Sequence, residues 1–94
     1  MVTKLVGILA LALLAGCSTT IDAEDYARGC ADTSECVVIS VGEICDCACE
    51  YSAINVADFE RYQDDRSSIS CNRQCEPCPE APAAVCQDLV CEAE

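Results

Sequence analysis

The sequence predicts a small disulfide-rich α+β domain with a short antiparallel sheet, one packed helix over about residues 55–69 and a C-terminal hairpin. Eleven of the 94 residues are cysteine, a share above the roughly 8–10% that marks disulfide scaffolds. Aromatic residues make up only 4% of the chain. A chain of this length also buries too little surface for a generous core. We therefore expect disulfides to supply much of the stability.

The first half of the cysteine-rich region predicts two paired strands. Residues 36–41 are rich in β-branched side chains, which favour strands. Gly42 and Glu43 follow as a turn. Residues 44–51 then alternate, so that their three cysteines would share one face of an extended chain. We therefore expect 44–51 to form a second strand that pairs with the first.

The long gap between cysteines predicts the helix. Asn55 is suited to the N-cap position, and Asp58 lies three residues later, as in a relative of the capping box. Val56, Phe59 and Tyr62 follow at helical spacing. This apolar stripe is expected to pack on the strand pair rather than to bind a ligand.

The C-terminal third predicts an irregular segment followed by a hairpin. Three prolines between Cys75 and Pro82 exclude regular structure there. Residues 85–91 are expected to form a tight hairpin around Asp88, although the chain lacks the Asn-Gly or Asp-Gly pair typical of such turns.

The first residues have the proportions of a secretory signal. A positive charge at Lys4 precedes an almost purely apolar run over residues 5–15. This run is too short to span a bilayer, which takes roughly 20 apolar residues. We therefore expect an exported protein rather than one with a transmembrane helix.

The end of the apolar run, Leu14-Ala15-Gly16-Cys17, resembles the lipobox of bacterial lipoproteins. The lipobox is the motif that signal peptidase II recognises. The resemblance implies cleavage before Cys17, a diacylglyceryl thioether on Cys17 and acylation of the new amino terminus. Several acyl chains hold a protein on a membrane far more firmly than one, because each buried CH₂ contributes about 0.8 kcal/mol.

These expectations divide the chain into three parts. Residues 1–16 are a cleaved signal peptide, residues 17–29 are the lipidated cysteine and a flexible tether, and residues 30–94 are the cysteine-rich disulfide domain. By the same resemblance, Ser18 favours the outer membrane if the cell has two membranes. We expect a lipid-anchored envelope protein.

The other ten cysteines are an even set, and export places them where disulfides persist. All ten are expected to form disulfides, with a pairing that the sequence leaves open. They are Cys30, Cys36, Cys45, Cys47, Cys49, Cys71, Cys75, Cys78, Cys86 and Cys91.

Composition also argues against several functions. The net charge is −12, which repels nucleic acid. The chain has no histidine, which excludes Ser–His and Cys–His nucleophilic catalysis and a mixed zinc site. No acidic run has calcium-loop spacing. We expect no enzymatic activity, no cofactor and no metal site.

Two cysteine motifs keep a third class of function open. Cys75-Glu76-Pro77-Cys78 resembles the active site of thioredoxin-type oxidoreductases, but no βαβ unit precedes it. The alternation of Cys45, Cys47 and Cys49 is similar to metallothionein spacing, which needs reduced thiols.

The region from Cys30 to Cys91 resembles small cysteine-rich domains of exported bacterial lipoproteins, through the run Glu35–Ile39 and the Cys45–Cys49 triple. We expect a non-enzymatic binding or structural module of the envelope, with the membrane as one partner and an unidentified envelope or extracellular protein as another. The first alternative is a protease inhibitor that uses the loop Glu76–Ala84. The second is a thiolate metal-binding or redox protein.

Overall fold

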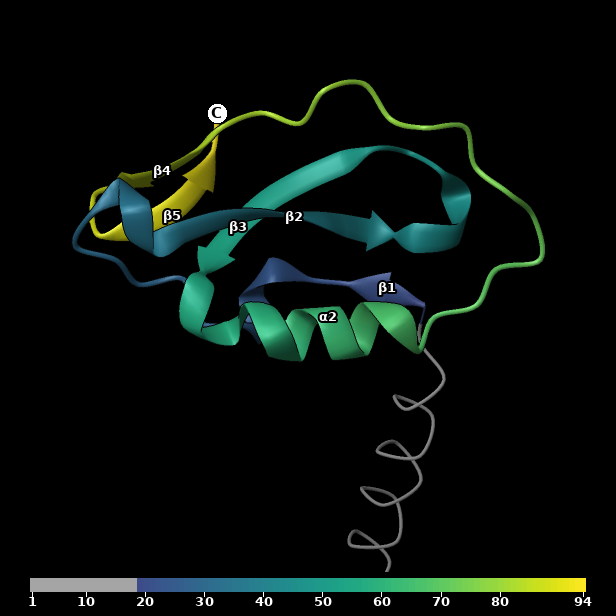
Figure 1. Ribbon diagram of the computed structural model, residues 1–94, viewed down its shortest axis with the longest axis horizontal. Helices are drawn as coiled ribbons and strands as arrows, with labels where there is room; N and C mark the ends of the chain where they lie inside the picture. The colour runs from purple at the N-terminus through teal and green to yellow at the C-terminus, as the bar shows by residue number, and fades with distance from the viewer. Residues whose placement is uncertain (1–18) are drawn as a thin grey trace, which may run out of the picture.

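The computed structural model describes residues 19–94 (Figure 1). Within them lie a three-stranded antiparallel sheet in the order β1-β2-β3, one α-helix and a separate two-stranded sheet. The predicted disulfide-rich α+β class is therefore confirmed. The predicted signal peptide and the lipidation site at Cys17 lie outside the described residues. No helix within residues 19–94 is long and apolar enough to cross a membrane.

The central hairpin consists of β2 (Cys36–Glu43) and β3 (Glu50–Asn55). The register pairs Cys36 with Asn55 and Val41 with Glu50. On β2, Val37, Ile39 and Val41 recur every second residue and face the core, as expected for a strand with one covered face.

The predicted second strand over 44–51 is wrong in its position. Residues Ile44–Asp46 form a 3-10 turn, and Cys47 and Cys49 have φ of 60° and 56°. Left-handed backbone cannot continue a strand, so the alternating cysteines form the connection between the two strands. The second strand starts at Glu50, where buried Ala53 and Ile54 supply the packing.

The helix α2 (Phe59–Ser67) follows a 3-10 turn over Val56–Asp58 and lies along one face of the sheet (Figure 1). Asn55 caps this turn as predicted, since its side chain accepts a hydrogen bond of 2.9 Å from the Ala57 backbone N–H. The helix is shorter than the predicted 55–69.

The flexible tether predicted for 17–29 differs from the structure over its described part. Strand β1 (Thr20–Ile21) pairs with the end of β2, and a 3-10 turn covers Ala23–Asp25. Ile21, Ala23 and Tyr26 are buried. Part of the core therefore comes from a segment that looks polar in sequence.

Tyr26 fixes this N-terminal segment against α2. Its hydroxyl donates a 2.6 Å hydrogen bond to Asp65, and its ring meets Tyr62 edge-on at 6.0 Å between centroids. Burial, followed by the Asp65 hydrogen bond, raises the pKa of Tyr26. The core therefore lies between the sheet, α2 and the N-terminal segment. Its buried members are Ile21, Ala23, Tyr26, Ile39, Ile54 and Tyr62.

The C-terminal hairpin consists of β4 (Ala84–Gln87) and β5 (Val90–Ala93), which confirms the prediction. Its two-residue turn places Asp88 at φ 53° and Leu89 at φ 66°. Both values match the type I′ turn, which normally favours Asn or Gly at these positions. Leu89 is 72% exposed, so packing does not compensate for the unfavourable backbone.

We expect Leu89→Asn to raise the free energy of unfolding by about 0.5–1 kcal/mol, because asparagine tolerates the left-handed region better than leucine. Thermal unfolding of the oxidised protein, followed by circular dichroism, measures the change. Gln87→Asn, at an exposed strand position of the same hairpin, is the control and should give no gain. An unchanged or lower stability of Leu89→Asn would contradict the argument.

Candidate functional site

The ten cysteines beyond Cys17 form five disulfides in two groups. One group holds the C-terminal hairpin against the start of β2. The other joins the β2–β3 connection to the segment between α2 and β4. The bridges are Cys30–Cys86 and Cys36–Cys91 in the first group, and Cys45–Cys71, Cys47–Cys75 and Cys49–Cys78 in the second.

The second group is a ladder in which partners follow one another in the same order along both segments. We call the segment over residues 70–83 the strap. It has no regular structure and curves around the β2–β3 connection before it enters β4 (Figure 1). Every residue from Asn72 to Ala81 is exposed. The strap is therefore a solvent-facing segment that covalent bonds hold in place.

Hydrogen bonds supplement the ladder along the strap. Arg73 donates from Nε to the Cys45 carbonyl at 3.2 Å, and the Tyr51 hydroxyl donates to the Pro79 carbonyl at 3.4 Å. At the far end, Ala83 and Glu94 exchange two backbone hydrogen bonds of 3.0 and 2.8 Å. The strap is thus fixed at both ends and in the middle.

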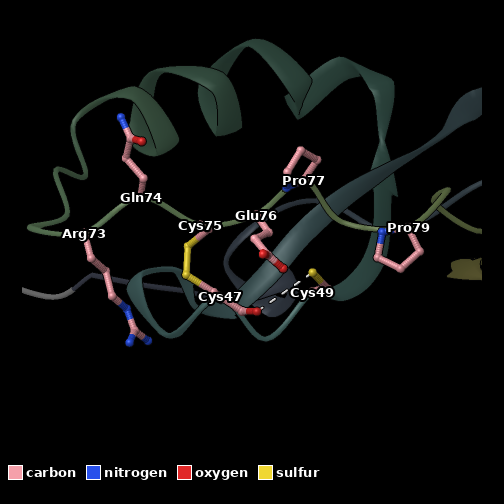
Figure 2. Close-up of a pocket in the computed structure, with 8 residues that line it drawn as sticks. All are labelled: Cys47, Cys49, Arg73, Gln74, Cys75, Glu76, Pro77 and Pro79. Carbon is pink, nitrogen blue, oxygen red and sulfur yellow. Dashed lines mark hydrogen bonds between the residues drawn. A yellow bond between two sulfur atoms is a disulfide. The ribbon is translucent and has the colours of Figure 1, made fainter.

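Figure 2 shows how the strap side chains are distributed. Gln74 and Pro77 lie on one side of the segment, whereas Arg73 and Glu76 lie on the side of the β2–β3 connection. The hollow between them and the ladder has a volume of about 380 Å³. It is open, and its lining combines cysteines of the ladder and two prolines with the polar side chains of Arg73, Gln74 and Glu76.

The Cys75-x-x-Cys78 motif does not form its own disulfide. Cys75 bonds to Cys47 and Cys78 to Cys49. Thioredoxin-type chemistry needs two sulfurs of one motif that can bond to each other. The metallothionein-like triple is likewise occupied, because these two bridges use Cys47 and Cys49, and Cys45 bonds to Cys71. The sulfurs of Cys30, Cys36 and Cys91 lie within 4.8 Å of one another, but each belongs to a disulfide.

Sequence reasoning located the irregular Pro-rich segment but not the residues that fix it. No sequence pattern marks Tyr51, whereas Arg73 has one signal, since it is the only cation between Cys71 and Glu94. The pairing of the ladder also could not be read from spacing, because it depends on which segments the fold brings together.

Three carboxylates away from the strap accept hydrogen bonds that fix loops and turns. Glu35 accepts from the Ala31 and Asp32 N–H groups, and this lowers its pKa. The hydroxyls of Thr19 and Thr20 donate to Glu43, which lowers the pKa of that carboxyl. These groups serve structure, and they make stability depend on pH.

A third such group is Asp58, whose pKa is lowered by the Ala27 N–H and by Arg61. Because the folded pKa lies below the unfolded one, each carboxylate stabilises above the unfolded pKa, and this contribution is lost as pH falls through the folded pKa. We expect the contribution of these carboxylates to be complete from pH 7 to about 5 and to be lost as the pH falls below about 4.

Thermal melts of the oxidised protein from pH 7 to 2 measure this dependence. Glu43→Gln should reduce it, since one of the three carboxylates no longer titrates, while Glu35 and Asp58 still do. Glu60→Gln, at an exposed position on α2, is the matched control and should keep the full dependence. An equal slope in both variants would show that Glu43 does not contribute.

No model of a known protein family matches the chain, and no match is found among curated proteins or among solved structures.

Proposed function

We propose that this protein is an exported lipoprotein, held on a membrane through acyl chains on Cys17, and that its domain is a binding or structural module without chemistry of its own. The leader pattern and the Leu14–Cys17 motif support the anchor. The five disulfides support export, because such bridges persist in oxidising compartments.

The strap is the feature of the structure that supports a binding role. Three disulfides hold an exposed segment that contributes no residue to the buried core. The bridges therefore restrain a segment that packing in the core does not hold. A segment fixed before it meets a partner loses less conformational entropy on binding. We infer that the strap is the recognition surface.

Protease inhibition is the second candidate, and the exposure of the strap favours it. The loop Glu76–Ala84 leaves the ladder at Cys78 and enters β4 two residues before Cys86. Inhibitors of this kind present an extended, rigid loop to the protease. Assay of a panel of serine and cysteine proteases at micromolar protein tests it, and a panel without inhibition removes it.

For the protein extracted from membranes with detergent, we expect intact mass spectrometry to show a chain that starts at Cys17 and carries acyl chains. Alkylation without reductant should add no label, because every remaining cysteine is bridged. Cys17→Ser should keep its leader and lose the lipid.

Two outcomes would contradict the proposal separately. An unmodified chain that still begins at Met1 would contradict the proposal that the protein is a lipoprotein. Several alkylated thiols in the native protein would instead favour the thiolate metal-binding or redox alternative.

A further inference from the structure

The described domain starts almost at the proposed anchor. Thr19 is fixed in the fold, because its hydroxyl donates to Glu43 and its carbonyl accepts from the Ile44 N–H at 3.3 Å. Two residues of extended chain reach at most about 7 Å. If Cys17 carries lipid, the acylated residue therefore lies within that distance of Thr19, and the domain cannot stand away from the bilayer.

The surface around Thr19 is consequently the part of the domain nearest to the lipid. A hollow of about 530 Å³ adjoins it, and polar side chains from the Ile44–Asp46 turn and the start of the strap line this hollow. We call this surface the anchor face. Its members are Thr19, Asp46, Ser70, Asn72 and Arg73.

The arginines of the domain differ in their partners. Arg28 pairs with Glu24 and Glu92, and Arg61 pairs with Asp58 at 3.0 Å. Within residues 19–94, Arg66 and Arg73 make no ion pair. Arg73 belongs to the anchor face, and Arg66 lines an adjacent hollow with Glu43 and Ile44.

The two unpaired cations of a strongly acidic chain thus lie at the end where it approaches the lipid. Asp46 belongs to the anchor face with Arg73, Glu43 and Glu50 line the hollow with Arg66, and Glu76 lines a further hollow with Arg73. Of these acids, Glu43 already accepts hydrogen bonds from Thr19, Thr20 and the Cys45 N–H. The turn of the C-terminal hairpin lies at the opposite end of the molecule from the start of β1 (Figure 1).

We propose that the anchor face rests in the headgroup layer of the bilayer, with the guanidinium groups of Arg73 and Arg66 on lipid phosphates, and that the Asp88-Leu89 turn points into water. The proposal rests on lipidation of Cys17. Guanidinium groups bind phosphate oxygens through two parallel N–H donors, which suits phosphates of net-neutral lipids as well. The start of the strap is then occupied by the membrane, and only the part beyond Cys75 extends away from the bilayer and remains free as a recognition surface.

The chain offers a clean probe, because its only lysine is Lys4, in the predicted leader. Single-lysine variants Asn72→Lys and Gln87→Lys therefore place one side-chain amine at the anchor face or at the far hairpin without disturbing a disulfide. An amine-reactive nitrobenzoxadiazole label also removes the added charge. The lipidated variants are inserted into phosphatidylcholine–phosphatidylethanolamine vesicles that contain a headgroup spin-labelled lipid as quencher.

We expect the label at position 72 to lose most of its fluorescence and the label at position 87 to keep it. In the Asn72→Lys protein, Arg73→Gln should reduce the quenching. Gln87→Glu changes the net charge by the same amount at the far end, and it should leave the quenching unchanged.

Flotation of the vesicles tests the lipid anchor separately from the orientation of the domain on the membrane. A protein that does not float with them lacks the anchor, which overturns the proposed function and this inference together. A protein that floats but shows equal quenching at both positions overturns this orientation alone. Equal effects of Arg73→Gln and Gln87→Glu would show that Arg73 does not contact the headgroups.

Discussion

Removal of the Cys36–Cys91 bridge by Cys36→Ala/Cys91→Ala is expected to lower the free energy of unfolding by about 3–5 kcal/mol. This bridge ties β5 to the start of β2 across a sequence separation of 55 residues, and Cys91 is fully buried. Its loss therefore relaxes a long-range constraint and leaves a cavity where a sulfur was packed. Net stabilities of small domains are only about 5–15 kcal/mol, so the variant should be close to unfolding at 37 °C.

The matched control is Cys49→Ala/Cys78→Ala, which removes one step of the ladder. Cys78 is exposed, and the neighbouring Cys47–Cys75 bridge still closes nearly the same loop. We expect a loss of about 1 kcal/mol or less, because loop-closure entropy changes little when an adjacent cross-link remains. Chemical unfolding under non-reducing conditions compares the two variants. Equal losses would show that the ladder stabilises the core as much as the hairpin bridge does.

This contrast also bears on function. If the ladder contributes little to the stability of the core, its three bridges serve to fix the strap, as the proposed recognition role requires. A large loss on removing one ladder bridge would instead indicate that the strap is part of the folding unit and would weaken that reasoning.

The sequence predicted those elements whose signals are local. The N-cap Asn55, the packing of Phe59 and Tyr62 on the core, and the β-branched run that starts at Cys36 each reflect interactions within a few residues. Val56 was predicted to share this packing, but it lies in the 3-10 turn before α2 and is 48% exposed. The hairpin around Asp88 formed without the usual turn residues, since its strands are also held by disulfides to distant segments.

The failures have a common physical cause, because each depends on contacts far apart in sequence. Cys45 to Cys49 alternate as a strand would, but their partners at Cys71 to Cys78 hold them in a bent connection. Ile21 and Tyr26 lie in a polar stretch that looks like a tether until the sheet and α2 are in place. The strap was predicted as irregular, whereas its rigidity comes from cross-links that no local pattern encodes.

The small core makes single buried side chains unusually important, and Ile54→Ala is expected to cost about 2–5 kcal/mol of the free energy of unfolding. Ile54 is completely inaccessible to solvent and is paired with Val37 on β2. It shares the core with Tyr26 and Tyr62, which join the N-terminal segment to α2. The cavity left by alanine would therefore loosen both layers that cover the sheet.

Val56→Ala is the matched control, since Val56 follows β3 directly but is 48% exposed. Its substitution should change stability by no more than about 0.5 kcal/mol. Urea unfolding of the oxidised variants gives both values. A small loss for Ile54→Ala would mean that the five bridges alone maintain the fold and that its apolar core is dispensable. A large loss would show that the disulfides supplement a real core, in which the segment just after the proposed anchor is a structural layer rather than a tether.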